Sequence, residues 1–312
     1  MKPKFSIILP VYNNANIIGT VLTSIINQTY PIERIEIIAV DDASTDESLQ
    51  NLKRFQTKHE ELLKIIEHKE NQGRACTRND GINLAQGDLL LFLDSDISIH
   101  EKFIERTVNF INQKDVIGVM GKILPGKDIK QNNYNKYQKY LYQAPRGAMQ
   151  LEKPSPVSYS HFLFSITTIK SKAIDKIGLM DENLTHHGGE DTEYAFRLEQ
   201  KYSNQLYFNP NLKGYHHDFV NFKTALNRMR KYGKFNVPYI IKKHPQMKEI
   251  YFYDFLEGNL IQRFLGIIAT SKSFITMMHF LYKYLPVPLV FGVIKILFGS
   301  MLLQGIEAGR KS

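Results

Sequence analysis

Apolar runs alternate with segments of helically spaced apolar residues over the first 120 residues. The runs predict β-strands at Phe5–Val11, Ile35–Val40, Leu63–Ile66, Asp88–Leu93 and Val116–Met120. The spacing between them predicts helices at about Ile17–Ile26, Ser44–Lys58, Gly73–Ala85 and Glu101–Asn112. Because several runs are almost continuously apolar, we expect strands buried on both faces, as in a parallel sheet flanked by helices. The pattern therefore predicts an α/β fold.

The first apolar run is interpreted as a strand and not as a signal peptide. Lys2 and Lys4 precede it, but Pro10 and Asn13-Asn14 follow with no small-residue cleavage site. A proline and an Asn pair after a short apolar run are typical of a buried strand followed by a turn. The single cysteine, Cys76, excludes an intrachain disulfide framework and is compatible with the cytoplasm.

The formal charge of +9 is unevenly distributed along the chain. Residues 1–120 hold 13 basic and 17 acidic side chains, whereas residues 219–312 hold 14 and 4. A basic surface for nucleic acid is therefore not expected on the first part of the chain, and no nucleic-acid partner is predicted. An acidic ligand bound there must be held by specific groups.

Polar residues follow three of the predicted strands. They are Pro10–Asn13, Asp41-Asp42 and Asp94-Ser95-Asp96. In an open α/β sheet, ligands bind outside the carboxyl ends of the strands. On an extended chain, the two carboxylates of Asp-Ser-Asp would lie on the same side, which suits a divalent cation completed by phosphates and water. The sequence therefore predicts a site for a metal-bound diphosphate.

Five motifs in order resemble those of the family 2 glycosyltransferases. They are Ser6–Asn13, Gln28–Tyr30, Val40–Asp46, Asn71–Gly73 with Arg78-Asn79, and Leu93–Asp96. The resemblance covers roughly residues 4–235 and implies the GT-A fold, a mainly parallel central sheet flanked by helices, here with a helical C-terminal extension. Gly188–Arg197 is similar to the acceptor-side Glu-Asp motif, in a Gly-Gly-Glu-Asp form also found in galactosyltransferases.

The resemblance assigns the donor site to the strand ends. It implies that Tyr12, beside Pro10, packs on the nucleobase, where an aromatic face stacks well. Asp42 would accept a hydrogen bond from a uracil N–H, and Asp41 would be structural or contact the ribose. Further nucleotide contacts are implied for Arg78, for Asp94, which would lie at the ribose or in the metal shell, and for Ser95. Arg74, one turn before Arg78, is either a helper or a surface arginine.

The acceptor side is assigned to the Gly-Gly-Glu-Asp motif. Inverting transfer needs a carboxylate that removes the acceptor proton, and Asp191 is expected to be this general base. Glu190 is expected to orient the acceptor. Gly188 and Gly189 would let the backbone approach a bound sugar. The alternative is that the two acids merely complement a helix N-terminus.

The metal ligands are expected to be Asp96 and one of two adjacent histidines, His216 or His217, and the sequence does not distinguish between them. The two histidines follow a predicted strand at Gln205–Phe208 and a predicted loop at Asn209–Gly214. The expected cation is Mn²⁺ or Mg²⁺. A basic cluster on a predicted helix, Arg228 to Lys234, would contact a diphosphate or a lipid phosphate, or would simply be a solvated face. Because the chain has no Trp, the motif of the processive synthases is absent. Single additions are therefore expected.

Two domains are predicted: residues 1–240 as the GT-A domain and residues 241–312 as a basic, apolar helical extension. Gln143–Pro156 is a linker candidate. In the extension, Leu260–Leu285 is apolar at helical spacing but interrupted by charges, and Leu289–Ile306 contains Lys295 as its one basic residue. An interfacial or partner-binding helix, a packed domain helix and a membrane span all remain open for Leu289–Ile306.

The sequence predicts a metal-dependent, inverting glycosyltransferase that uses a nucleotide-sugar donor, most simply a UDP-sugar. The expected acceptor is a surface glycan, lipid-linked and handled by a cytoplasmic enzyme held peripherally on the inner face of the cell membrane. A nucleotidyltransferase acting on sugar phosphates is an alternative, although the first strand is not followed by a Gly-rich basic loop. A non-catalytic nucleotide-sugar-binding protein is another.

Overall fold

The structure is a computed structural model that describes the chain except for residues 1, 114, 127–131, 142–150, 219 and 311–312. The chain forms two compact units: an α/β unit of residues 1–129, 139–183 and 190–218, and a helical unit of residues 130–138, 184–189 and 219–312. The domain boundary expected at residue 240 falls inside a helix of the second unit. Within the linker candidate Gln143–Pro156, residues 143–150 lie outside the described residues.

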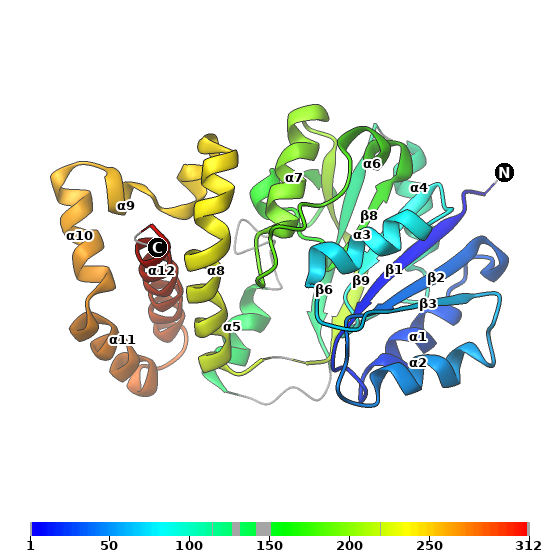
Figure 1. Cartoon of the computed structure of the whole chain (residues 1–312), viewed down its shortest axis with the longest axis horizontal. Coiled ribbons are helices and arrows are strands. Elements are labelled where there is room, and N and C mark those ends of the chain that lie inside the picture. Colours follow the sequence, from blue (N-terminus) through cyan, green and yellow to red (C-terminus); the bar gives the residue numbers. More distant parts are fainter. Residues whose placement is uncertain (1, 114, 127–131, 142–150, 219, 311–312) are drawn as a thin grey trace. The chain divides into compact units, whose positions relative to one another are not determined.

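The α/β unit contains one central sheet with the strand order β3-β2-β1-β4-β8-β6-β9-β5, and β7 pairs with β9 (Figure 1). The first four strands are parallel: β1 (Phe5–Val11), β2 (Ile35–Asp41), β3 (Leu63–Glu67) and β4 (Leu89–Leu93). The others are β5 (Ile97–Ile99), β6 (Gly118–Pro125), β7 (Ser155–Pro156), β8 (Ile166–Lys170) and β9 (Leu206–His216). Among these, β6 and β9 are parallel, whereas β8 is antiparallel to both β4 and β6. The α/β class is confirmed, with a second half that is mixed.

Helices cover both faces of this sheet. Side chains of Ile7 and Leu9 join a core with α1 (Ile18–Ile26), α2 (Ser48–Gln56) and α4 (Phe103–Gln113), whereas Ile8 joins a core with α3 (Arg74–Leu84), α6 (Ser171–Ile177) and α7 (Glu190–Lys201). Successive residues of a strand point to opposite faces, so a continuous apolar run fills both cores. This explains why the apolar runs were reliable predictors of strands.

Parallel pairing brings the carboxyl ends of β1, β2 and β4 to one edge. Val11 lies opposite Asp41 in the β1–β2 register, and Ile8 lies opposite Phe92 in the β1–β4 register. The polar segments that follow these three strands therefore gather at this edge, as the sequence predicted.

One local prediction is wrong. Asn209–Gly214 was expected to be a loop, but it belongs to β9, where Gly121 pairs with Asn209 and the next residue, Lys122, pairs with Lys213. The turn-forming residues between them are accommodated as a bulge in a continuing strand. The helix expected after the capping residues Ser44 to Asp46 begins at Ser48, whose amide donates to Asp46 Oδ1 at 2.9 Å.

The helical unit is built on α8 (Phe222–Lys243) and α12 (Leu289–Gly309), which pack along each other. A Cβ on Gly233 would lie 2.3 Å from the Leu302 carbonyl oxygen, and one on Gly305 would lie 2.2 Å from the Arg230 carbonyl oxygen. Glycine is therefore needed where the two backbones meet. The remaining helices are α9 (Asp254–Glu257), α10 (Leu260–Thr270), α11 (Lys272–Tyr284) and the first part of α5 (Asn133–Leu141).

The apolar tail has a different structure in each of its two parts. Leu260–Leu285 is not one helix, because α10 and α11 meet at a bend of 62°. By length and composition α12 could cross a membrane, but half of its most apolar window is buried inside the protein. In the structure this segment is a helix that packs along α8, and the interfacial and membrane-spanning alternatives stay predictions.

Candidate active site

The loop after β1 presents an aromatic ring to solvent. Tyr12 is 48% exposed, whereas the strand before it is buried. Asn13 has a left-handed backbone, and its side-chain oxygen accepts a hydrogen bond from the Thr45 amide at 2.8 Å. The Asn14 amide donates to Ser48 Oγ at 2.7 Å. These bonds fix the first strand-end loop to the second and hold the exposed ring at the sheet edge, one residue beyond β1.

The acids after β2 are both buried but differ in their partners. The Asp42 carboxylate accepts hydrogen bonds from the amides of Gln72 and Gly73 and contacts a ring nitrogen of His68. Asp41 Oδ2 accepts from the Ser44 amide, while its Oδ1 has no hydrogen-bond partner among the described residues. Asp42, which was expected to bind the nucleobase, thus already bonds to three groups of the protein. Of the two acids, it is Asp41 that has a carboxylate oxygen without a hydrogen-bond partner in the described part of the chain.

Arg78 is a buried arginine that links two carboxylates, and it does not lie on the surface. Its Nη2 lies 3.2 Å from Asp94 Oδ1 and its Nη1 lies 3.3 Å from Glu190 Oε1. Burial alone would raise the pKa of Asp94, but the guanidinium groups of Arg74 and Arg78 hold it below its usual value. Burial and the charge of Asp191 raise the pKa of Glu190, and the opposing effect of Arg78 and Arg74 is smaller. Arg78 thus pairs with Oε1 of Glu190, whereas the buried Oε2 has no hydrogen-bond partner among the described residues.

Asp94 and Asp96 have different direct partners, and the segment that carries them is a turn and not an extended strand. The segment is a turn in which the Ile97 amide donates to the Asp94 carbonyl oxygen at 3.0 Å. Asp94 contacts Arg78 and Asp96 contacts His216 of β9, while both carboxylates raise the pKa of Arg74. Ser95 between them is buried, and its Oγ accepts from Asn14 Nδ2 at 2.6 Å.

His216 is the histidine that lies beside Asp96. Its Nε2 is 3.2 Å from Asp96 Oδ2, whereas His217 Nε2 is 2.7 Å from Ser98 Oγ. The buried Oδ1 of Asp96 has no partner within the described part of the chain. A carboxylate with an unsatisfied oxygen next to an imidazole offers the oxygen and nitrogen ligands that Mn²⁺ and Mg²⁺ sites use.

Asp191 lies in the first turn of α7 and is partly exposed. Its Oδ1 accepts from the Thr192 amide at 2.8 Å, so the helix start orients the side chain. Desolvation lowers the pKa of Arg74, but the carboxylates of Asp94, Asp96, Glu190 and Asp191 raise it by more. Four acids thus surround two arginines, and this acidic excess would repel a diphosphate unless a cation accompanied it.

Gly188 and Gly189 belong to the helical unit and have φ values of 101° and 97°. A Cβ on Gly189 would lie 2.5 Å from the ring of Tyr232, and the Asn236 amide group donates to the Gly188 carbonyl oxygen at 2.7 Å. The group that closely approaches these glycines here is thus an aromatic ring of α8. In the neighbouring basic cluster, Arg230, Lys231 and Lys234 are exposed.

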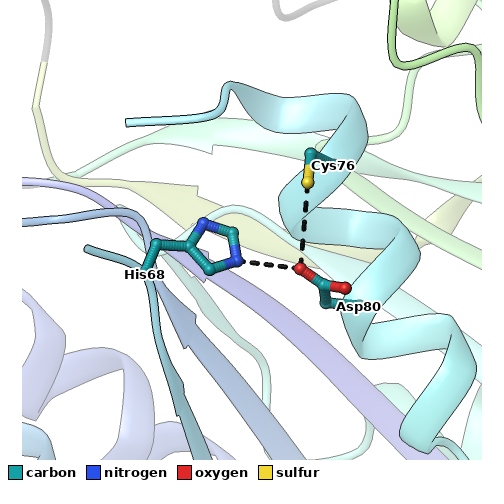
Figure 2. A group of neighbouring side chains, drawn as sticks. All are labelled: His68, Cys76 and Asp80. Carbon is teal, nitrogen blue, oxygen red and sulfur yellow. Dashed lines mark hydrogen bonds and ion pairs between the residues drawn. The ribbon is translucent and has the colours of Figure 1, made fainter. Parts of the chain in front are cut away.

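Asp42 also contacts a polar cluster that was not predicted from the sequence. His68, which follows β3, lies beside Asp80 and Cys76 of α3 (Figure 2). Ligand atoms of these three residues lie within 4.8 Å of one another, a spacing that raises the question of a metal site. However, His68 Nε2 and Asp80 Oδ2 are 2.8 Å apart, and two ligands of one tetrahedral zinc stand about 3.3 Å apart. The geometry is that of a hydrogen-bonded cluster.

The fold is that of the GT-A glycosyltransferases. Structures similar to this chain include Staphylococcus aureus TarS 1-349 in complex with UDP-GlcNAc, with a TM-score of 0.57 and 18% identity over 99% of this chain and 92% of that one. Mannosyltransferase PcManGT from Pyrobaculum calidifontis, in complex with GDP-Man and Mn2+, has a TM-score of 0.61 and 16% identity over 97% and 87% of the two chains.

The chain belongs to glycosyl transferase family 2, whose model matches residues 6–177. Poly(ribitol-phosphate) beta-glucosyltransferase of Bacillus spizizenii is 39% identical over 137 residues, which are 42% of this chain and 22% of that protein. Glycosyltransferase AglE of Haloferax volcanii is 38% identical over 121 residues, 39% and 40% of the two chains. This chain therefore spans well under half the length of both relatives, and the resemblance to the family inferred from its motifs is confirmed.

Proposed function

We propose that this protein transfers a sugar from a UDP-sugar, with inversion, to a hydroxyl group of a cell-surface polymer. The observation that carries the proposal is the arrangement at the carboxyl ends of β1, β2 and β4. An exposed Tyr12, the Asp41-Asp42 pair and the Asp96–His216 pair gather at this edge of the sheet. An aromatic surface for a base beside a cation-binding carboxylate is what a nucleoside diphosphate requires.

The relatives support the choice of donor and acceptor. TarS is described in complex with UDP-GlcNAc and with UDP, and two of the relatives are named for transfer to poly(ribitol-phosphate). We extend this to the present chain as a UDP-sugar donor and a polyol-phosphate or glycan acceptor. Gly188-Gly189, which precede Glu190 and Asp191 in the sequence, are our candidate for the acceptor loop.

The residues that would hold a cation are Asp96 and His216. The unsatisfied Oδ1 of Asp96 and the adjacent imidazole fit a hard or borderline divalent ion such as Mn²⁺. When bound, the ion would neutralise the charge that develops on the departing diphosphate. Asp94 stays ionised between its two arginines and therefore keeps this part of the site negative and attractive to a cation.

Asp191 is proposed to accept the proton of the acceptor hydroxyl. Its Oδ1 is held by the start of α7. Because the base and the departing diphosphate must lie on opposite sides of the sugar, a single displacement inverts the anomeric centre. Glu190, whose Oε1 is paired with Arg78, is proposed to hold Arg78 and the start of α7 in place.

The experiment that tests this function is an incubation of the full chain with UDP-sugars and Mn²⁺ or Mg²⁺, with free UDP as the measured product. Cation-dependent release of UDP from one of the donors is expected. Formation of UTP and a sugar 1-phosphate when pyrophosphate is added, without release of UDP, would instead support a nucleotidyltransferase. Binding of a UDP-sugar with no turnover towards any acceptor would support the non-catalytic alternative.

We further propose that the helical unit attaches the enzyme to an anionic membrane through α10 and α11. Their outer surface exposes large apolar side chains, including Leu260 (83%), Ile261 (72%), Phe264 (62%) and Phe280 (61%). Soluble proteins rarely leave so many neighbouring apolar residues exposed without a partner. The bend between α10 and α11 gives two short helices, too short to span a bilayer but suited to lie in its interface.

The charges of residues 258–306 favour an anionic membrane as the surface that this segment binds. Residues 258–306 contain four basic residues, Arg263, Lys272, Lys283 and Lys295, and no Asp or Glu. Each basic side chain near an anionic bilayer contributes about 1 kcal/mol. Peripheral attachment to the inner face of the cell membrane would also bring the enzyme to a lipid-linked acceptor.

Replacing Phe264 and Phe280 together by aspartate is expected to lower partitioning onto vesicles that contain phosphatidylglycerol by at least about tenfold, because each phenylalanine loses roughly 1.5–3 kcal/mol of apolar burial. Flotation of the full chain measures this. Ile32→Asp, at a site 42% exposed in the α/β unit, is the matched control and should float like wild type. Truncation at residue 260 is unsuitable because it removes α12 from its packing on α8. Equal flotation of the double variant and wild type would refute the attachment.

A further inference from the structure

His68 is held by a carboxylate on each side of its ring. Its Nδ1 lies 2.8 Å from Asp42 Oδ1, and its Nε2 lies 2.8 Å from Asp80 Oδ2. The His68 and Asp42 side chains are only 5% and 7% exposed, whereas Asp80 is 37% exposed. Figure 2 shows the imidazole directed at Asp80, with Cys76 on the same face of α3. The proposed mechanism does not yet use this buried, titratable group.

The two short contacts define the protonation state of His68. A neutral imidazole has one N–H and one lone pair, so it can donate to only one of the two carboxylates. With both nitrogens at hydrogen-bonding distance from carboxylate oxygens, the ring can donate to both ionised carboxylates only as an imidazolium. Burial lowers the pKa of His68, but Asp42 and Asp80 raise it by more. Cys76, the other titratable group of α3 at this cluster, has a pKa raised to about 11 by burial and nearby acids and is uncharged at neutral pH.

Asp42 in turn fixes the start of α3. Its two oxygens accept the amides of Gln72 and Gly73 at 2.8 and 3.0 Å. No side chain at the N-cap position, Gly73, performs this role, so the carboxylate of a distant loop supplies both the hydrogen-bond acceptor and the favourable negative charge. The first turns of α3 carry Arg74 and Arg78, whose charges hold Asp94 ionised.

We infer that His68 is a positioning residue for the donor: its Nδ1–H holds the Asp42 carboxylate in the orientation that shapes the nucleotide end of the site and sets the start of α3. The inference rests on the proposed function, because it takes the strand-end site to be where the nucleoside diphosphate binds. His68 does not touch the donor itself. Its effect passes through Asp42 and the Gln72–Gly73 amides.

Donor binding should consequently depend on pH through His68. The folded-state pKa of His68 is raised. The two hydrogen bonds from its ring to Asp42 and Asp80, here called the clamp, are therefore both present below the ordinary histidine pKa. The clamp weakens as pH rises through the raised pKa. After deprotonation, one remaining proton serves two carboxylates, and the bond to Asp42 is lost in a fraction of the molecules. The KM for the donor should therefore rise with pH, with kcat much less affected.

Two isosteric substitutions separate the two sides of the ring. In His68→Asn the amide nitrogen occupies the position of Nδ1 and can still donate to Asp42. In His68→Gln the amide nitrogen occupies the position of Nε2 and can donate only to Asp80. We expect His68→Asn to keep a donor KM close to that of wild type and to lose the pH dependence. His68→Gln should raise the donor KM by about tenfold or more, the effect of losing a hydrogen bond to a charged group.

Steady-state kinetics of UDP-sugar turnover between pH 6 and 9, with both variants beside wild type, provides the test. Equal KM values for the Asn and Gln variants, or a wild-type pH profile that matches that of His68→Asn, would overturn the inference and leave the proposed function standing. Absence of turnover in wild type would instead refute the proposed function. In that case, ¹⁵N NMR of the His68 ring still decides the protonation state: two protonated nitrogens at neutral pH support the clamp, and one unprotonated nitrogen contradicts it.

Discussion

Replacement of Asp191 by asparagine is expected to lower kcat for sugar transfer by about 10²–10⁴-fold, the range of a general base. Asparagine keeps the shape of the side chain, and its Oδ1 can still accept the Thr192 amide that now bonds to Asp191 Oδ1. The start of α7 should therefore remain intact, and only the ability to take a proton is lost. The KM for the donor should change little, because the proposed donor site is at the carboxyl ends of β1, β2 and β4 and not at the start of α7.

Transfer rates for Asp191→Asn and for Asp175→Asn, an exposed aspartate of α6, measure this effect. The control should retain wild-type activity. If Asp191→Asn transfers sugar at the wild-type rate, the proton must go elsewhere and the assignment of the base is wrong. Glu190 would be a poor substitute, because it is buried and paired with Arg78.

The second large effect is expected at the cation site. Asp96→Asn and His216→Ala should each weaken Mn²⁺ binding and lower cation-dependent turnover on the order of 10²-fold or more, since each removes a proposed ligand. His217→Ala is the matched control, because that ring bonds to Ser98 and not to Asp96. Its Mn²⁺ affinity should stay near wild type.

Titration of Mn²⁺ in the presence of UDP, followed by the loss of the free-ion EPR signal, measures this affinity directly. Equal losses in His216→Ala and His217→Ala would mean that the described Asp96–His216 contact does not mark the site. Unchanged affinity in Asp96→Asn would remove the cation site from this strand end altogether.

The sequence predicted the elements that depend on local patterns. The strands β1, β2 and β4 are continuous apolar runs, and this alone implied burial between two helical layers. The edge of the sheet where Asp41-Asp42 and Asp94–Asp96 gather followed from parallel pairing. The same reasoning failed for Asn209–Gly214, because turn-forming residues also occur in a bulged strand, and the bulge is defined by the pairing partner β6.

Side-chain roles that depend on distant partners could not be predicted. Arg78 bridges Asp94 and Glu190, which reach it from elsewhere in the chain, and Asp96 contacts His216 of a distant strand. His68 gave no signal, since a single histidine after a strand is unremarkable until Asp42 and Asp80 lie on either side of it. For the two adjacent histidines, neither the pattern nor the resemblance distinguished His216 from His217.

The measurement that tests the central claim most directly is ¹H NMR of the product formed from a UDP-sugar, a divalent cation and a glycan or polyol-phosphate acceptor. The account predicts free UDP and a glycoside whose anomeric configuration is opposite to that of the donor, formed only when the cation is present. A product that keeps the donor configuration, or transfer that is equally fast with excess chelator, would contradict it.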